Sequence, residues 1–295
     1  MRWKNYLMMT SLKETLARLA QKTGKARVVA GGSDLMIQMR EKNGENLILL
    51  DISQIDEIRG IAEEENYLLI GAASTMAEIA SSILVKTKAQ ALARGASSVG
   101  SPQIRNVATI GGNVVNAQPA ADAAVPLVAL EAEARIVSPE GEKYVPVEDL
   151  YRDVGKSILN PARELISHFR VPVWNSPLRT SGMERLAKRK AFTLPTLSVA
   201  VALELDEKGK GFKKVRIVAA PVAPVPWRAR RAEEVLKNAV LTEKMIEKAA
   251  AIAREDANPR ESLRGGSAYR KDMVEVLTRR ALMDSLSRLK EEVTP

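Results

Sequence analysis

The sequence predicts an α+β protein in which interleaved strands and helices precede a region of antiparallel strands and a helical tail. Three observations support this prediction. A β-branched run over 26–30 ends at two glycines and passes into apolar residues at helical spacing. Strand-like segments dominate from 134 to 219, and the region 231–289 repeats Leu, Ile, Val and Ala at intervals of three and four.

Local signals define the elements of the first half. Ser11 and Glu14 form a capping-box pattern before an apolar helical face, which predicts a helix over 11–22. The strand over 26–30 is followed by two glycines and by a short helix that starts near Leu35. By the same criteria we expect strands over 46–52 and 67–71, and helices over 75–84, 88–96 and 123–131.

The second half begins with a predicted hairpin, because strand-like residues 134–138 and 143–147 flank a Pro-Glu-Gly-Glu turn. Two prolines and several polar residues over 172–177 resist both helix and central strand, so we place a domain boundary there. The remaining expected elements are strands over 164–171, 197–205 and 215–219, and helices over 231–237, 242–255 and 269–289.

The composition is that of a folded protein with a large core. The chain has 295 residues, of which 45% are hydrophobic, and this suits two or three domains. It contains no cysteine, which excludes disulfides and iron–sulfur clusters held by this chain. The first residues lack an apolar signal-like run, and no stretch reaches the roughly 18 to 20 apolar residues of a membrane span. We therefore expect a cytoplasmic protein without a membrane span.

Other common functions find little support. The net charge of +9 suggests nucleic acid, but acidic residues are interspersed among the basic ones and no stacking aromatics lie between them, so we expect no nucleic-acid partner. His168, the single histidine, lies in a predicted strand without a serine–aspartate arrangement around it. The chain has no H-E-x-x-H, no Walker lysine loop and no G-x-S-x-G. The sequence therefore shows none of the usual residue patterns for zinc, phosphate or ester chemistry.

Two Gly-Gly loops are the remaining candidates for a functional site. In 30–34 (Ala-Gly-Gly-Ser-Asp) and 109–113 (Thr-Ile-Gly-Gly-Asn), glycine permits a positive φ and lets backbone N–H groups approach a phosphate. Ser33 adds a hydroxyl donor, and the helix after it directs its positive end toward the anion. Taken singly, each loop is more simply a tight turn, and neither has the G-x-G-x-x-G spacing of an ordinary dinucleotide fold.

The residues around these loops change that judgement, because they resemble a known family. The segments 30–35, 100–113 and 117–122 resemble the FAD-binding subunit of the molybdenum hydroxylases, a family that includes xanthine dehydrogenase, carbon monoxide dehydrogenase, nicotinate dehydrogenase and 4-hydroxybenzoyl-CoA reductase. The pattern T-I-G-G-N followed by A-x-P-x-x-D is long and specific. The segments 262–270 and 277–282 look like the C-terminal signature of the family, so the resemblance covers nearly the whole chain.

The resemblance implies a two-lobed FAD-binding domain of the vanillyl-alcohol-oxidase-like (PCMH) type over 1–174, with lobes of about 1–57 and 58–174. A C-terminal domain of antiparallel strands and helices follows over 178–295. It also implies cofactor contacts, which are Val29, Ala30, Gly31, Gly32, Ser33, Asp34 and Leu35, then Thr109, Ile110, Gly111, Gly112 and Asn113, then Gly100, Ser101 and Ile104, and finally Asp122, Ile166 and Lys190.

These contacts divide by the part of the cofactor they would meet. The two Gly-Gly loops would surround the pyrophosphate and ribityl chain, and Gly100, Ser101 and Ile104 would line the flavin. Asp122 would meet a cofactor hydroxyl, although it is equally typical of a helix N-cap. Ile166 would lie nearer the adenosine, and Lys190 or Phe192 would be a candidate for the flavin ring, with a solvated charge cluster as the alternative.

The implied function is an electron-transfer subunit. Substrate would be oxidised at a molybdopterin centre on a large partner subunit, and electrons would reach the FAD through [2Fe-2S] clusters on a small partner subunit. The acceptor would be NAD, oxygen, a quinone or another compound, and the absence of cysteine fits this division of labour. One alternative is a stand-alone flavin reductase of the cell-wall precursor type. Another is a basic nucleic-acid-binding or scaffold protein in which both loops are only turns.

Overall fold

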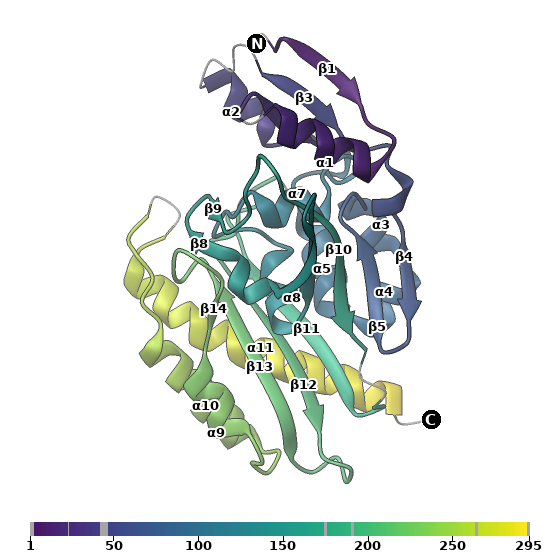
Figure 1. Cartoon of the computed structure of the whole chain (residues 1–295). Coiled ribbons are helices and arrows are strands. Elements are labelled where there is room, and N and C mark those ends of the chain that lie inside the picture. Colours follow the sequence, from purple (N-terminus) through teal and green to yellow (C-terminus); the bar gives the residue numbers. More distant parts are fainter. Residues whose placement is uncertain are drawn as a thin grey trace.

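The N-terminal lobe is a three-stranded parallel sheet with a helix on each face. The computed structural model describes residues 3–22, 24–41, 47–173, 176–189, 192–262 and 265–293. The sheet has the order β1-β3-β2 and lies at the top of Figure 1. The elements of the lobe are β1 (Asn5–Met8), α1 (Leu12–Gln21), β2 (Ala26–Val29), α2 (Leu35–Glu41), β3 (Ile48–Asp51) and the 3-10 turn η1 (Asp56–Ile58).

Alternation along the strands explains why both faces are covered. In helix α1, Leu16 and Leu19 pack with Leu50 of β3 in one buried cluster. On the other face, Met39 of α2 packs with Leu49, the neighbour of Leu50 in β3. The Ser11 side chain accepts a bond from the Glu14 amide, so the predicted cap of α1 is confirmed.

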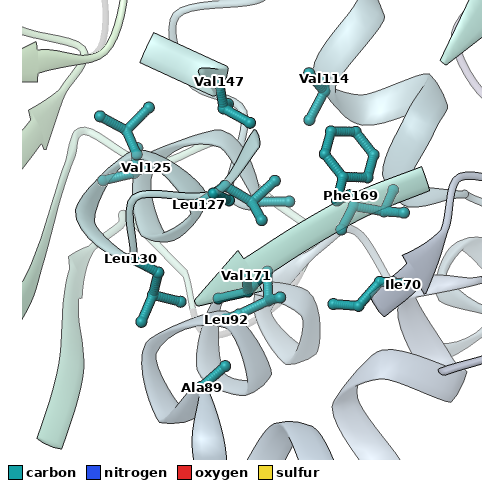
Figure 2. Close-up of a cluster of buried hydrophobic side chains, with 14 of the residues drawn as sticks. Ile70, Ala89, Leu92, Val114, Val125, Leu127, Leu130, Val147, Phe169 and Val171 are labelled. Atoms are coloured by element: carbon teal, nitrogen blue, oxygen red, sulfur yellow. The ribbon is translucent and has the colours of Figure 1, made fainter. Parts of the chain in front are cut away.

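The second lobe is a five-stranded antiparallel sheet, in the order β4-β5-β10-β6-β7, with helices packed on one face. Figure 2 shows the core between them, where Phe169 and Val171 of β10 meet Leu127 of α8 and Leu92 of α5. The elements are β4 (Ile61–Glu64), β5 (Tyr67–Gly71), α3 (Met76–Ser81), α4 (Ile83–Lys88), α5 (Gln90–Ser98), α6 (Pro102–Arg105), α7 (Ile110–Val115), α8 (Ala124–Ala129), β6 (Glu133–Ser138), β7 (Gly141–Pro146), η2 (Val147–Leu150), β8 (Tyr151–Asp153), β9 (Lys156–Ser157) and β10 (Leu165–Pro172).

The C-terminal part is a four-stranded antiparallel sheet, β11-β12-β13-β14, followed by three helices. Helix α11 crosses the sheet and runs beside α10 (Figure 1). The elements are β11 (Arg179–Leu186), β12 (Leu197–Leu205), β13 (Phe212–Ala220), β14 (Trp227–Arg228), α9 (Arg230–Leu236), α10 (Glu243–Asp256) and α11 (Ser267–Val293).

Strand β12 is buried on both faces and links the two parts of the chain. Val199 and Val201 point into the cluster formed with helices α9, α10 and α11. Ala200 and Ala202 point the other way and join the core of the second lobe, together with Met183 of β11. The hydrophobic core is therefore continuous across the predicted boundary at 172–177.

Charged residues reinforce the same junction. Glu148, in the turn η2, pairs with Arg228 at 3.1 Å, with Arg216 at 3.5 Å and with Arg230, all from the C-terminal part. Glu131 pairs with Arg216 as well, at 2.5 Å. These side chains form the interdomain ion-pair network, in which the two carboxylates belong to the second lobe and the arginines to the C-terminal sheet and helix α9.

Most predicted elements are confirmed, and the differences have local causes. The expected single helix over 75–84 is wrong, because the Ser82 side chain caps a separate helix, α4. Six strands, β1, β4, β8, β9, β11 and β14, were not predicted. Strands β8, β9 and β14 are only two or three residues long, and β4 and β11 carry charged residues that hide the strand pattern. The predicted strand start at 46 lies outside the described residues. No helix in the described part of the chain is both long and apolar enough to cross a membrane.

Candidate cofactor site

The fold brings the first Gly-Gly loop against Val107 and Ala108, the two residues that lead into the second loop. A β-carbon placed on Gly31 would lie 1.8 Å from the carbonyl oxygen of Val107, so only glycine allows the two backbones to approach this closely. The side-chain amide of Gln38, in α2, donates to Asn116 at the end of α7 at 3.0 Å. The first loop and the helix that follows it thus lie against the segment that carries the second loop.

The first loop has the backbone of an anion site. Gly32 has a φ of +66°, as expected for this loop. Among the residues that the structure describes, the amides of Gly31, Gly32 and Ser33 donate to no main-chain carbonyl. Successive N–H groups around a left-handed glycine form a concavity that suits a phosphate. The Ser33 hydroxyl is 3.5 Å from the Asp34 carboxylate, which is long for a hydrogen bond between oxygens. This weak contact leaves the hydroxyl available to a ligand.

The second loop differs from the expectation. Gly111 and Gly112 lie in the first turn of helix α7, and neither has a positive φ, so the predicted left-handed turn is wrong here. The Gly111 amide donates to the Ala72 carbonyl at 2.8 Å, and the Gly112 amide donates to the Thr109 hydroxyl at 3.2 Å. A β-carbon on Gly111 would lie 2.8 Å from the Ala72 oxygen. Gly111 is therefore needed for close packing, and the first loop has more unused backbone donors than the second.

The segment 100–104 is bonded to the residues that contact the first loop, because the carbonyl of Ile104 accepts from the amides of Val107 and Ala108. Gly100 has a φ of +49°, and the Ser101 side chain caps helix α6 by accepting from the Ile104 amide at 3.3 Å. The carbonyl of Gly100 accepts a hydrogen bond from the Phe192 amide at 3.0 Å. The loop between β11 and β12 is thereby tied to the predicted flavin-lining residues, while Lys190 of that loop lies outside the described residues.

Asp122 is a buried carboxylate with one cationic partner. Its Oδ1 accepts from Nε of Arg185 at 2.9 Å, and Asp122 is 5% exposed. Burial raises the pKa of Asp122 to about 6, against the opposing pull of Arg185. The alternative role as a helix cap is not seen, because α8 begins after Ala123 and has no side-chain cap.

The other predicted contacts are less exposed to a ligand. Ile166 is 4% exposed in β10 and packs into the core that also holds Ile110. Val29 is 4% exposed and packs in the cluster beneath α2, against which Leu35 lies. Ala30 packs against the cluster beneath α1. The side chains of these residues pack in the core and support the backbone of the loops.

Sequence reasoning missed the groups that hold the loops in place. Arg185 was missed, because its strand was not predicted and it lies 63 positions from Asp122. Ala72 and Val107 have small or apolar side chains, and they act through their carbonyl oxygens, which no side-chain pattern announces. Only the two Gly-Gly pairs gave a signal that some close approach was required.

Comparisons with known proteins identify the family of this chain. Residues 2–174 match the family model of the FAD binding domain in molybdopterin dehydrogenase, and residues 184–285 match that of the CO dehydrogenase flavoprotein C-terminal domain. The chain belongs to the family of FAD-binding subunits of molybdopterin-dependent dehydrogenases, which are oxidoreductases.

Individual relatives extend over nearly the whole chain. The xanthine dehydrogenase FAD-binding subunit of Escherichia coli O157:H7 is 31% identical over 264 residues, which is 89% of each chain. The carbon monoxide dehydrogenase medium chain of Hydrogenophaga pseudoflava is 30% identical and covers 92% of this chain and 93% of its own. The solved structure of carbon monoxide dehydrogenase from Hydrogenophaga pseudoflava superposes with a TM-score of 0.90 at 30% identity, covering 96% of this chain and 97% of the other.

Proposed function

We propose that this chain is the electron-exit subunit of a molybdenum-containing hydroxylase or dehydrogenase. It would receive electrons from the iron–sulfur clusters of a small partner subunit, after substrate oxidation at a molybdopterin centre on a large one. FAD supplies the redox chemistry when bound, and the chain orients it and sets its electrostatics. The observation that carries the proposal is the close approach of the first glycine loop, which offers three unused backbone donors, to Val107 and Ala108 just before the second loop.

The proposed assignment of residues follows from that geometry. The amides of Gly31, Gly32 and Ser33 would hold the pyrophosphate, because they face no main-chain acceptor in the described structure. The segment 109–113 would form the opposite wall by packing, with Asn113 partly fixed through its bond from the Ala123 amide at 3.2 Å. Asp122 would accept a hydrogen bond from a cofactor hydroxyl.

The remaining assignments concern the flavin ring and the adenosine. Gly100, Ser101 and Ile104 would line the flavin, and Lys190 or Phe192 would approach its ring from the neighbouring loop. Phe192 is 64% exposed and its amide donates to the carbonyl of Gly100, which supports that role. Ile166 is buried in the core of the second lobe, and it would pack near the adenosine end of the cofactor. We also keep the domain division at 1–174 and 178–295 as a proposal.

The partner subunits are inferred from what this chain lacks and from what its relatives are called. The chain has no cysteine and can hold no iron–sulfur cluster. Two relatives are named as medium chains of carbon monoxide dehydrogenase, and a solved relative is titled as a Cu,Mo-containing enzyme. NAD, oxygen and a quinone stay open as acceptors, and a cytoplasmic location stays a prediction from the sequence.

The test of FAD binding uses two matched glycines. Gly32 and Gly209 have φ values of +66° and +67°, and Gly209 lies in the turn between β12 and β13, where an added β-carbon would have no atom within 4 Å. Valine at either position is strained, because a β-branched side chain disfavours a positive φ. Gly32→Val should abolish FAD binding measured by flavin fluorescence quenching, while Gly209→Val should retain it.

The outcomes separate the possible errors. If Gly32→Val binds stoichiometric FAD, the loop is misassigned. If the wild-type chain is colourless and cannot be reconstituted with FAD, the function itself is wrong. A stand-alone flavin reductase would purify from its native host without partners. We expect a tagged chain to bring down a large molybdopterin subunit and a small cysteine-rich one.

A further inference from the structure

Arg185 joins three segments that are far apart in the sequence. It lies in strand β11 of the C-terminal part, and its Nε donates to Oδ1 of Asp122 at 2.9 Å. Its Nη2 lies 3.4 Å from the second carboxylate oxygen and donates to the carbonyl of Thr193 at 2.6 Å. One guanidinium therefore holds both the buried carboxylate of the second lobe and the loop between β11 and β12.

The loop that Arg185 holds is also fixed at the neighbouring residue. The amide of Phe192 donates to the carbonyl of Gly100, and Arg189 donates to the carbonyl of Phe192 at 2.9 Å. The peptide before Thr193 is thus anchored to the segment that would line the flavin. Without Arg185, this loop would lose its link to Asp122 but keep its link to Gly100.

We infer that Arg185 is the positioning residue of the cofactor site, which acts through Asp122 and the adjoining loop and does not itself contact FAD. The inference rests on the proposed function, because it assumes that Asp122 meets a cofactor hydroxyl. Its side chain is 11% exposed and that of Asp122 is 6% exposed, so the pair is shielded from solvent. A guanidinium that grips a carboxylate through two nitrogens fixes its orientation as well as its charge.

Arg185 is the charged group that acts on Asp122 among the described residues. Its strand neighbour Glu184 is turned to Arg94 of helix α5, at 3.1 Å. Helix α8, which begins just beyond Asp122, contributes only apolar residues. From the β11–β12 loop, Arg189 is engaged with the Phe192 carbonyl. Within the described parts of the chain, Arg185 is the residue that forms an ion pair with Asp122.

Removing Arg185 has a defined chemical consequence. A buried carboxylate that loses its cation takes up a proton at higher pH, because desolvation of the anion is no longer offset. The neutral carboxyl accepts a weaker hydrogen bond than the anion does. In Arg185→Gln we expect FAD to bind about 10- to 100-fold more weakly at neutral pH. Arg185→Lys keeps the charge and should recover part of this loss.

The first experiment needs no FAD. The apo chain is labelled with ¹³C at aspartate carboxyl carbons, the Asp122 signal is assigned by its loss in Asp122→Asn, and its titration is followed by NMR in wild type and in Arg185→Gln. The matched control is Arg94→Gln, which removes an arginine from the exposed ion pair next door. A rise of at least one pH unit in the Arg185→Gln midpoint, with no change in the control, supports the inference. An unchanged midpoint overturns it.

The second experiment measures the FAD dissociation constant from pH 5 to 9 by fluorescence quenching. We expect the pH at which affinity falls to move upward in Arg185→Gln, and the profile to flatten in Asp122→Asn. If the two variants act through one contact, the double variant should be no weaker than the worse single variant. Fully additive losses would mean that Arg185 acts elsewhere and would overturn the inference. A chain that binds no FAD at all would refute the proposed function, while the NMR titration would still report on Arg185 and Asp122.

Discussion

Replacing Gly31 by alanine tests whether the first glycine loop must lie this close to the backbone of Val107, just before the second loop. The added methyl would lie 1.8 Å from the Val107 oxygen, whereas ordinary contacts begin at 3.4 Å. One backbone must therefore move by about 1.5 Å, since the obstructing atom is main chain and cannot rotate away. Overpacking of this kind costs about 1 to 3 kcal/mol of folding free energy. A shift of that size in the pyrophosphate wall should also weaken FAD binding by at least about tenfold.

The assay combines urea unfolding of the apo chain with FAD titration. The control is Gly24→Ala, because Gly24 lies in the same lobe, has a φ of +75° and has no atom within 4 Å of an added β-carbon. Its positive φ gives Gly24→Ala a backbone strain that Gly31→Ala lacks, because Gly31 has no positive φ, so a greater loss of stability in Gly31→Ala reports the collision alone. If Gly31→Ala is no less stable than Gly24→Ala and binds FAD as tightly as wild type, the close contact between Gly31 and Val107 has no functional importance.

Two further predictions concern stability. Burial, aided by the positive charge of Arg135, lowers the pKa of His168. The stability that the neutral His168 contributes to the folded chain is therefore fully present above pH 6.5 and is lost as pH falls below that value. His168→Gln should reduce the loss of the urea midpoint between pH 7.5 and 5.5, and an unchanged pH profile would contradict this. Glu148→Gln should cost about 1 to 2 kcal/mol, because it leaves three arginines without their shared carboxylate. The effect should shrink at 1 M salt. Glu234→Gln, from the exposed pair with Lys237, should change stability by less than about 0.5 kcal/mol, and an equal effect in both variants would refute the role of the network.

The fold was predictable where local signals and tertiary packing agree. The Ser11 cap, the 134–146 hairpin and the apolar strand β12 each follow from a short pattern, and each is confirmed. Strand β11 was missed because its sequence is polar. Ser181 accepts a hydrogen bond from the Ala91 amide of helix α5 and Arg185 donates to Asp122, so these polar residues of the strand have partners that are remote in the sequence.

The second glycine loop shows a different limit. Glycine is a poor helix former, so two in succession suggest a turn. Helix α7 nevertheless begins there, because Thr109 caps it and the Ala72 carbonyl accepts from Gly111. Tertiary contact overrides propensity at this position. The sequence marked this segment by its two glycines, whereas its helical geometry depends on contacts that form only in the fold.

The burial of β12 on both faces has a consequence for how the subunit can move. Separation of the two parts would expose Ala200 and Ala202 together with the apolar helices α5 and α8, so a hinge between them would cost a large part of the core. The subunit should unfold in one transition and should act as a rigid block. Electron tunnelling to and from the flavin would then depend on how this block docks against its partners, because opening of its own domains cannot adjust the distance.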